Sequence, residues 1–199
     1  MALLIVGWIL WCILHSLLIT DTINKLVKEQ GGLLQGSYRL IYSLFSFLSL
    51  IPLVWYLYSL PQQVIFTWSG WLRIPQGILL LYGVLMCSAG YRVYDMKYLV
   101  GIRQWQSYQR NTELSSLPFR CEGALAYVRH PWYSSGFPIL WAFGPITDAN
   151  LPVRIILTLY LIIGTVLEER KLVQELGEPY IRYQQQVPML IPWKGRVRF

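Results

Sequence analysis

The sequence predicts an all-α, polytopic membrane protein with about five transmembrane helices, the last two forming a helical hairpin that precedes a cytosolic helical segment. Three observations support this fold class. Hydrophobic residues make up 55% of the 199 residues and charged residues only 14%, a balance that is unusual in soluble chains. Several apolar stretches reach the roughly 20 residues that cross a bilayer core. Most lysines and arginines lie between these stretches.

The first three spans are predicted from uncharged runs of the sequence. Residues 1–20 contain no lysine, arginine or acidic residue. Because no basic residue precedes Lys25, we expect a retained anchor and not a cleavable signal peptide. The second span is predicted at about residues 40–60 and the third at about 74–91, between Arg73 and Arg92.

The last two spans are predicted on either side of a short polar turn. The chain is apolar from Pro131 to residue 146, polar over residues 147–150, and apolar again over residues 151–167. This pattern indicates two helices joined by a tight turn. Proline suits the first position of a helix, and we expect Pro138 to kink the short helix that begins at Pro131.

The placement of basic residues predicts the orientation in the membrane. Of the 17 lysines and arginines, 15 fall between spans one and two, between spans three and four, or after span five. Only Arg73 and Arg154 fall on the other side. We therefore expect a cytoplasmic (inner) membrane protein with its N-terminus outside and its C-terminus in the cytosol. Topology and anionic lipids account for the net charge of +7, and no basic-aromatic pattern suggests nucleic acid as a partner.

The cysteines and histidines do not indicate a disulfide framework or a metal site. Cys12, Cys87 and Cys121 are odd in number, and two of them fall within predicted spans. His15 and His130 have no neighbours at a regular ligand spacing. We expect a single helical domain over residues 1–199 that holds no metal.

A polar segment precedes the fourth span. In Arg129-His130-Pro131, the proline should start a helix whose unpaired N–H groups lie beside a guanidinium. Such an arrangement suits a carboxylate or a phosphate. Anchoring of the helix end at the lipid headgroups explains the same residues equally well.

Acidic and aromatic residues follow the fifth span. Glu168 and Glu169 stand where the helix dipole disfavours acids, unless a cation pairs with them or the helix continues to a cap at Gly177. Salt bridges to neighbouring arginine or lysine residues are the alternative explanation. Tyr180 and Tyr183 are three residues apart on a short helix and share one face, although membrane-interface anchoring also explains them.

As a set, these segments resemble the membrane methyltransferases typified by isoprenylcysteine carboxyl methyltransferase and phosphatidylethanolamine N-methyltransferase. The shared pattern is Arg129-His130-Pro131-x-Tyr133, Glu168-Glu169, Gly177-x-x-Tyr180-x-x-Tyr183 and Val187-Pro188. The resemblance implies S-adenosylmethionine as the cofactor, in a portion of the chain at about residues 120–193. It also implies the cofactor-binding residues, which are Arg129, His130, Tyr133, Glu168, Glu169, Tyr180 and Tyr183.

A closer resemblance is to the methanethiol S-methyltransferases and their NnrU-like relatives. It rests on four further segments, at residues 11–18, 38–43, 101–104 and 187–192. The run from Asp95 to Val100 departs from those relatives, which are more apolar there. The resemblance implies a transferase that methylates a small or membrane-soluble thiol to a thioether.

Methyl transfer from a sulfonium requires a nucleophile that is held close to the methyl carbon and shielded from water. Because a thiol has a pKa of about 8.5, a cationic or hydrogen-bonding group near the sulfur would raise the reactive thiolate fraction. The candidates for this acceptor side, expected within about residues 1–110, are His15, Arg39, Arg103 and Gln104. A helix-to-helix hydrogen bond is the alternative for His15, and Asp95 either orients Arg103 or faces the cytosol.

Two alternatives to thiol methylation stay open at this point. Within the same class, the acceptor is a prenylcysteine carboxylate or a lipid amine. In a different class, the chain is a non-catalytic membrane subunit or a transporter, which would not need both the Arg129 and the Glu169 segments. The expected partners are a small-molecule or lipid-like acceptor and membrane lipids, and no sequence signal indicates an oligomeric state.

Overall fold

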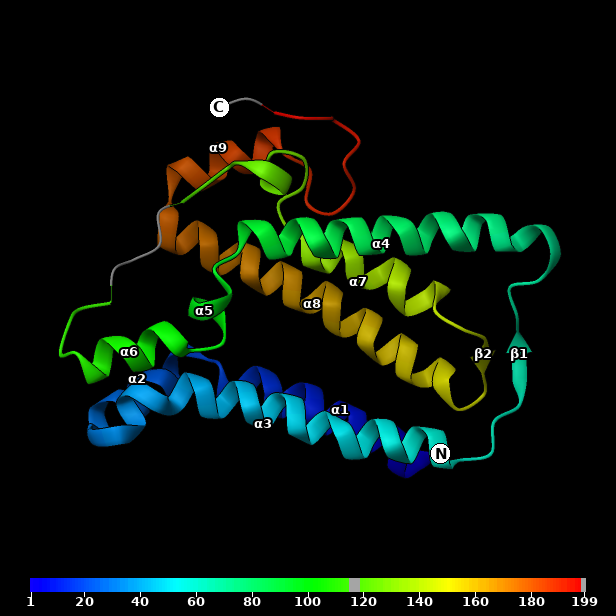
Figure 1. The fold of residues 1–199 in the computed structure, drawn as a ribbon, viewed down its shortest axis with the longest axis horizontal. Helices are drawn as coiled ribbons and strands as arrows, with labels where there is room; N and C mark the ends of the chain where they lie inside the picture. Colours follow the sequence, from blue (N-terminus) through cyan, green and yellow to red (C-terminus); the bar gives the residue numbers. More distant parts are fainter. Residues whose placement is uncertain (115–118, 198–199) are drawn as a thin grey trace. The chain divides into compact units, whose positions relative to one another are not determined.

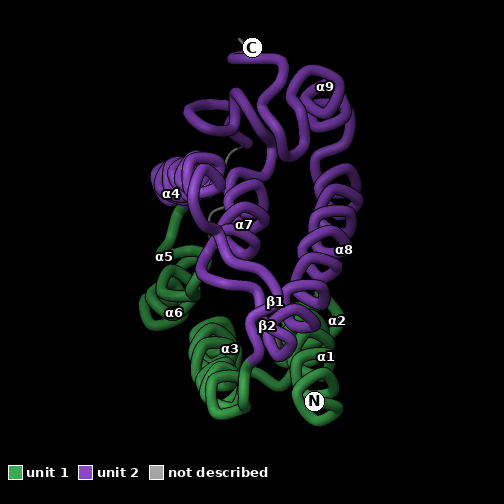
Figure 2. Tube along the Cα trace, turned by 90° about the vertical axis from the view of Figure 1, so that its right-hand side faces the viewer, with its two compact units in different colours: residues 1–62, 95–117 green, residues 63–94, 118–199 purple. Residues whose placement is uncertain are grey.

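In the computed structural model, residues 1–114 and 119–197 are described, and they form mostly helices (Figure 1). Arg198, which counts among the basic residues on the predicted cytosolic side, lies outside the described residues. The chain forms two compact units (Figure 2). The first comprises Met1–Gln62 and Asp95–Leu117, and the second comprises Gln63–Tyr94 and Pro118–Phe199.

The first unit is built around one long helix, α3. Its elements are α1 (Ala2–Leu18), α2 (Asp21–Gln30), α3 (Gly32–Ser59), α5 (Met96–Leu99) and α6 (Ile102–Gln109). Helices α1 and α2 meet at an angle of 59°. Helix α3 packs against α1, α2 and α6. Gly36 lets the Tyr108 ring of α6 lie directly on the α3 backbone, where any Cβ would collide with it.

The second unit contains the other helices and a small sheet. Its elements are β1 (Val64–Phe66), η1 (Gly70–Leu72), α4 (Arg73–Val93), η2 (Gly123–Ala126), α7 (Pro131–Ala142), β2 (Ile146–Thr147), α8 (Asn150–Leu176) and α9 (Glu178–Gln186). Helices α4 and α7 pack closely because Gly83 and Gly90 of α4 leave room for Ile139 and Trp132 of α7. Helix α8 contacts both α7 and α9.

Within the described part of the chain, three helical segments are long and apolar enough to cross a membrane: Gly32–Ser59, Gly70–Val93 and Asn150–Leu176. A fourth is added if the bent pair Ala2–Leu18 and Asp21–Val27 counts as one span. The predicted helical membrane fold is thus confirmed with three to four membrane-capable helices. Helix α7 has 12 residues, and at 1.5 Å per residue it is about 18 Å long, less than the ~30 Å of a bilayer core. The count of five spans and the hairpin stay predictions.

The segment between α7 and α8 is held by a buried arginine. Arg154, on the first turns of α8, is 7% exposed. Its guanidinium donates hydrogen bonds to the carbonyl oxygens of Leu140, Trp141, Phe143 and Pro145, at 2.6 to 3.1 Å, and its Nε donates to Asn150 Oδ1. Four carbonyl groups at and beyond the end of α7 are therefore paired without a continuing helix.

Several boundaries differ from the sequence expectation. Helix α3 begins at Gly32, ahead of residue 40, and contains Pro52. The antiparallel pairing of β1 with β2, with Val64 opposite Thr147, adds a two-stranded sheet to the expected all-α fold. Helix α8 continues past the apolar run that ends at residue 167: the following stretch, rich in Glu, Leu, Lys and Arg, extends the helix to Leu176, where Gly177 ends it with a φ of 61°, which is one of the two possibilities that the sequence left open. Glu168 and Glu169 therefore lie inside α8.

Candidate functional site

One carboxylate organises the second unit near the start of α7. Glu169 lies on α8, and its side chain is 9% exposed. Arg129 donates from Nε to Oε1 at 2.9 Å and from Nη2 to Oε2 at 2.6 Å. His130 Nε2 and the Tyr180 hydroxyl each lie 2.6 Å from Oε1, and Gln184 Nε2 donates to Oε2 at 2.7 Å. A carboxylate offers about four acceptor positions, so these donors saturate Glu169 in its ionised form.

The backbone places Arg129 and His130 beside this carboxylate. Pro131 occupies the first turn of α7 and His130 is the N-cap, as the sequence predicts. The backbone N–H groups of Arg129 and His130 donate to the carbonyl oxygens of Pro188 and Met189, at 3.0 and 3.2 Å. Residues 187–190 therefore run alongside the start of α7 and hold it in place.

Arg129 also fastens the end of α9. Its Nη1 donates to the carbonyl oxygens of Gln184, at 3.1 Å, and of Val187. These carbonyls lie at the C-terminal end of α9, where a cation is favoured by the helix dipole. The guanidinium thus links α8, through Glu169, with the end of α9.

Glu168 is the more accessible of the two glutamates. Its side chain is 42% exposed, and its Oε1 lies 3.9 Å from His130 Nδ1. His130 presents one ring nitrogen to each glutamate, because its Nε2 donates to Glu169. Burial, followed by the charge of Glu168, raises the pKa of Tyr94. Glu168 is therefore a half-exposed carboxylate near aromatic rings, whereas the acceptor positions of Glu169 are filled.

Aromatic rings surround this part of the molecule. The Tyr133 ring meets the His130 ring nearly edge-on, with centroids 5.6 Å apart. Tyr180 and Tyr183 also lie 5.6 Å apart, and Phe119 packs edge-on against both. Burial raises the pKa of both tyrosines, and donation to Glu169 raises that of Tyr180 further. The two hydroxyls are therefore neutral donors, Tyr180 to Glu169 and Tyr183 to the Leu125 carbonyl at 2.7 Å.

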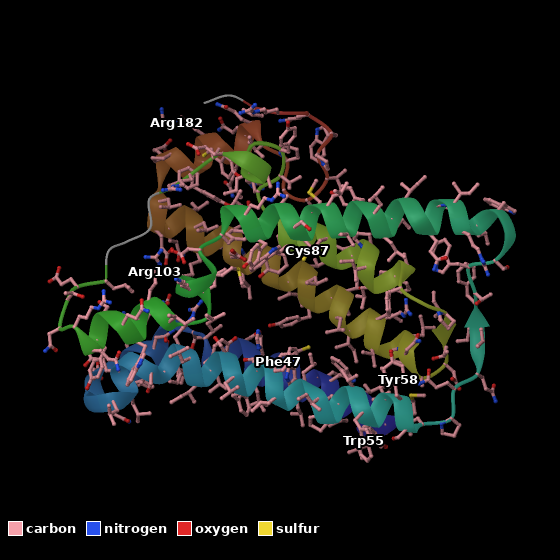
Figure 3. The ribbon with its side chains drawn as sticks, viewed as in Figure 1. Phe47, Trp55, Tyr58, Cys87, Arg103 and Arg182 are labelled. Atoms are coloured by element: carbon pink, nitrogen blue, oxygen red, sulfur yellow. The ribbon has the colours of Figure 1, made fainter. Side chains whose placement is uncertain are left out.

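A hollow beside α9 was not predicted. It has a volume of about 370 Å³ and is lined by Phe119, Cys121, Pro179, Arg182 and Gln186. Burial raises the pKa of the Cys121 thiol. The exposed Arg182, labelled in Figure 3, adds a positive charge to otherwise mostly apolar walls.

In the first unit, His15 lies in a polar seam between α1 and α3. Its Nδ1 lies 3.1 Å from Ser46 Oγ, and its Nε2 lies 3.1 Å from the Tyr42 hydroxyl. The ring stacks on Trp11, whose Nε1 donates to Ser49 Oγ at 3.0 Å. These contacts are of the helix-to-helix type that the sequence offered as the alternative for His15.

The other acceptor-side candidates lie around α5 and α6 in the same unit. Arg39 Nε donates to the Leu99 carbonyl at 3.0 Å. Arg103, half-exposed, forms an ion pair with Asp95, so Asp95 orients this guanidinium. Gln104 Nε2 donates to the Tyr98 carbonyl at 3.0 Å, while its Oε1 is buried without a hydrogen-bond partner among the described residues. The four acceptor-side candidates thus all belong to the first unit, and the seven cofactor-side candidates to the second.

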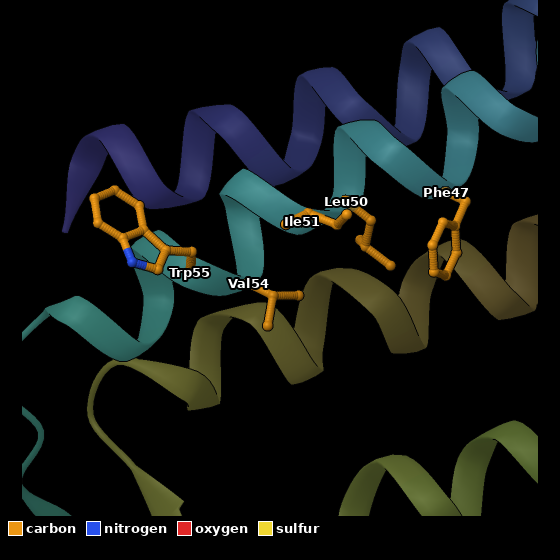
Figure 4. A pocket seen from close by; sticks show the side chains of 5 residues that line it. All are labelled: Phe47, Leu50, Ile51, Val54 and Trp55. Carbon is orange, nitrogen blue, oxygen red and sulfur yellow. The ribbon is translucent and has the colours of Figure 1, made fainter.

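The face of α3 carries an apolar hollow of about 320 Å³ (Figure 4). Its lining residues, Phe47, Leu50, Ile51, Val54 and Trp55, all come from α3. Such a surface matches lipid hydrocarbon and presents little polar chemistry. Among residues 1–114 and 119–197, no group of three potential metal-ligating side chains occurs.

Sequence reasoning missed Gln184. The available signal was its spacing, because a residue four positions after Tyr180 on α9 lies on the same helix face. Without the α8–α9 arrangement, nothing distinguished it from the two glutamines that follow. Ser134 was also missed: its hydroxyl donates to the Leu190 carbonyl at 2.6 Å and lies 2.6 Å from the Tyr82 hydroxyl.

The sequence is similar to several known proteins. The chain is 39% identical over 98 residues to a methanethiol S-methyltransferase of Crocosphaera subtropica, covering 49% of this chain and 38% of that protein. It is 35% identical over 157 residues to methanethiol S-methyltransferase 2 of Bradyrhizobium diazoefficiens, covering 77% and 59%. It is 29% identical over 163 residues to nurim of Xenopus laevis, covering 76% and 55%.

The chain spans about half the length of the curated relatives it matches. No solved structure gives a significant match. The family model described as NnrU protein matches residues 3–179, which is most of the chain and includes Arg129, His130 and Glu169 but not Tyr180 or Gln184. The chain therefore belongs to the NnrU protein family.

Proposed function

We propose that this protein is an integral-membrane methyltransferase that transfers a methyl group from S-adenosylmethionine to a small, methanethiol-like thiol, giving a thioether. Two relatives named methanethiol S-methyltransferase support the reaction, at 39% and 35% identity. Because the chain spans about half of their length, their activity is carried over as a proposal. The observation that carries it is that two neighbouring glutamates of α8 lie beside the start of α7, Glu169 with its acceptor positions filled and Glu168 half-exposed.

The residues present fit the charges of the proposed cofactor. S-Adenosylmethionine supplies an electrophilic methyl group on a cationic sulfur, and it also carries an ammonium and a carboxylate. Glu168, near the aromatic Tyr94 and Tyr133, suits a cationic group. The set we propose to hold the cofactor is Arg129, His130, Tyr133, Glu168, Glu169, Tyr180 and Tyr183. Within it, Glu169 acts by holding Arg129 and His130, because its acceptor positions are filled.

For the acceptor side we propose His15, Arg39, Arg103 and Gln104. Arg103 is the best placed of these to act on an incoming thiol, because its guanidinium is half-exposed and oriented by Asp95. A cation near the sulfur would lower the pKa of the thiol and increase the thiolate fraction. The proton of the thiol leaves to solvent before methyl transfer in this scheme.

Replacing Arg103 by Ala tests the acceptor assignment. We expect slower methyl transfer with unchanged affinity for S-adenosylhomocysteine, and a pH-rate profile displaced toward higher pH, because the thiol then needs more alkaline conditions to ionise. Initial rates between pH 6 and 10 and calorimetry provide the two measurements. The exposed Arg110, also in the first unit, is the control. An unchanged profile would remove Arg103 from the acceptor side.

For the membrane arrangement we propose five spans in a cytoplasmic membrane, with α7 and the residues up to 146 forming a short fourth crossing. The N-terminus then lies outside and residues 168–197 lie at the cytosolic side, where soluble S-adenosylmethionine is available. The distribution of lysine and arginine supports this orientation. Reporter fusions near Asn111 should report cytosol, and fusions within residues 147–150 should report the exterior. Reversed signals would contradict the proposal.

The decisive test of the function is a methyl-transfer screen with purified protein in lipid nanodiscs. Isotope-labelled S-adenosylmethionine is offered with methanethiol, a prenylcysteine and an ethanolamine lipid. We expect transfer to the thiol. Transfer to the prenylcysteine or the lipid instead would favour the other members of the class, which the relatives' names do not support. A protein that binds neither S-adenosylmethionine nor S-adenosylhomocysteine is not a methyltransferase.

A further inference from the structure

Three consecutive glutamines close α9, and they have different surroundings. Gln184 directs its amide at Glu169, with Nε2 and Oε2 2.7 Å apart. Gln185 and Gln186 are exposed, and the carbonyl of Gln185 accepts a hydrogen bond from Lys194. The same side chain at three successive positions therefore provides an internal comparison: one copy touches the site and its neighbour does not.

The hydrogen bond of Gln184 has a defined direction. An ionised carboxylate only accepts, so the amide nitrogen of Gln184 must be the atom that faces Glu169. Arg129 Nη2 donates to the same oxygen, Oε2, at 2.6 Å. The backbone carbonyl of Gln184 accepts from Arg129 Nη1 at 3.1 Å. Gln184 therefore contacts both members of the Arg129–Glu169 ion pair, with its side chain on the anion and its main chain on the cation.

Tyr180 contributes from the same face of α9. It precedes Gln184 by four residues, and its hydroxyl donates to the other oxygen, Oε1, at 2.6 Å. The charged or titratable groups around Glu169 are thus Arg129 and His130 before α7, Tyr180 and Tyr183 on α9, and Glu168 on α8 itself. Helix α9 supplies a donor to each carboxylate oxygen, which fixes the rotation of the carboxylate plane.

We propose that Gln184 is a positioning residue of the cofactor site: with Tyr180 it holds the Glu169 carboxylate in the one orientation that serves Arg129 and His130 together. This inference rests on the proposed function. Gln184 acts through Glu169 and does not itself touch the cofactor. The role calls for an uncharged donor, because a carboxylate at this position would repel Glu169 and an ammonium would compete with Arg129.

The first test replaces Gln184 by Leu and, as the matched control, Gln185 by Leu. Both variants remove one amide from neighbouring positions of the same helix. Loss of one of the two α9 donors to Glu169 predicts a roughly 5- to 10-fold weaker affinity for S-adenosylhomocysteine in Gln184→Leu. Gln185→Leu should stay within about twofold of wild type, because surface changes have small effects. Calorimetry in nanodiscs gives both values.

The second test uses Gln184→Glu and follows affinity against pH. At pH 8 the introduced carboxyl is ionised beside Glu169, and affinity should fall at least as far as in Gln184→Leu. The neighbouring negative charge raises the pKa of the introduced carboxyl, so it becomes protonated as the pH falls toward 5. It then donates a hydrogen bond as the amide did, and affinity should recover toward the wild-type value at the same pH. If Gln184 merely packed α9, the loss would be equal at every pH.

The outcomes separate this inference from the proposed function. If wild-type protein binds S-adenosylhomocysteine and both Gln184 variants bind it equally well, the positioning role is wrong and the proposed function stands. If wild-type protein binds no such ligand, both fail. Should Gln184→Leu not fold, as judged by thermal unfolding, Gln184→Glu decides the question, because a folded variant with pH-independent affinity also overturns the positioning role.

Discussion

Helix α7 has an arginine beside each end, the partly buried Arg129 at its start and the buried Arg154 at its end, and the two have different partners. At its start, Arg129 pairs with the carboxylate of Glu169, which also collects His130, Tyr180 and Gln184. At its end, Arg154 binds four backbone carbonyls and the side chain of Asn150. The first arrangement consists of side chains, several of which can ionise and can form new hydrogen bonds when a ligand binds. The second completes main-chain hydrogen bonding and has the character of a scaffold.

This contrast indicates which end of α7 can carry chemistry. Side chains that pair through charge, as Arg129 and Glu169 do, can change partners when a charged ligand binds. Glu168 lies half-exposed beside them. A guanidinium enclosed by carbonyls has no such freedom, because removing it leaves several backbone acceptors unpaired. Substitutions at the Arg154 end should therefore affect folding first, and those at the Arg129 end should affect ligand binding.

The largest effect is expected for Arg154→Ala. The change leaves the carbonyls at the end of α7 without their donor in a buried place, which should cost roughly 3 to 5 kcal/mol and lower the melting temperature by on the order of 10 °C. Thermal unfolding in detergent measures it. Arg73→Ala, at an exposed arginine of the same unit, is the control. A melting temperature equal to wild type would end the comparison between the two arginines.

An intermediate effect is expected at the two adjacent glutamates, where ligand affinity and melting temperature should respond differently. Glu169→Gln should weaken S-adenosylhomocysteine binding by ~1 to 3 kcal/mol and also destabilise the protein, because Arg129 keeps its charge without its counter-ion. Glu168→Gln should weaken binding with the melting temperature unchanged, because its carboxylate is half-exposed. If both variants lose stability equally, the division of roles between the two residues is incorrect.

The smallest effect concerns the two tyrosines of α9. Tyr180→Phe removes a donor to Glu169 and should reduce ligand affinity by about 1 kcal/mol. Tyr183→Phe keeps the aromatic ring and removes only the bond from the hydroxyl to the Leu125 carbonyl, so it should reduce stability and leave ligand affinity nearly unchanged. Calorimetry and thermal unfolding distinguish the two cases.

A pH series extends this test. Because burial raises the pKa of both tyrosines in the folded protein, the unfolded chain ionises first as the pH rises past about 10. Stability is fully present below that pH and falls above it. Each Phe variant should show a shallower fall between pH 9 and 11 than wild type, and identical slopes would contradict the assignment.

Local signals predicted the parts of the fold that depend on nearby residues. Pro131 starts α7, Gly177 ends α8, and α4 spans Arg73–Val93, close to the expected bounds, because helix starts, caps and apolar runs are encoded within a few residues. That Arg129, His130 and Glu169 belong to one site was predictable only from their motifs taken together, because the residues lie far apart in the sequence. The sequence alone does not tell which of the two glutamates is buried in the network and which is exposed, because that depends on which face of α8 packs against Arg129 and His130.

The features that escaped prediction depend on contacts between distant residues. The apolar run after Pro131 extends to residue 146, yet α7 ends at Ala142, and Arg154 satisfies the carbonyls at that end from another helix. The pairing of Val64 with Thr147 joins residues that no local pattern connects. Gln184 looks like its two neighbours in sequence, and only the packing of α9 on α8 distinguishes it.

The backbone bonds from Arg129 to Pro188 and from His130 to Met189 have a consequence for biosynthesis. The ribosome makes Arg129 and His130 well before their acceptors Pro188 and Met189. These backbone bonds can therefore form only after some sixty more residues, including α8, have been synthesised. During that interval Arg129 lacks the partners that it has on α8 and at the end of α9. The Glu169 network can close only after α9 and the residues following it have emerged. Chains interrupted within α9 should therefore be inserted into the membrane yet lack the site.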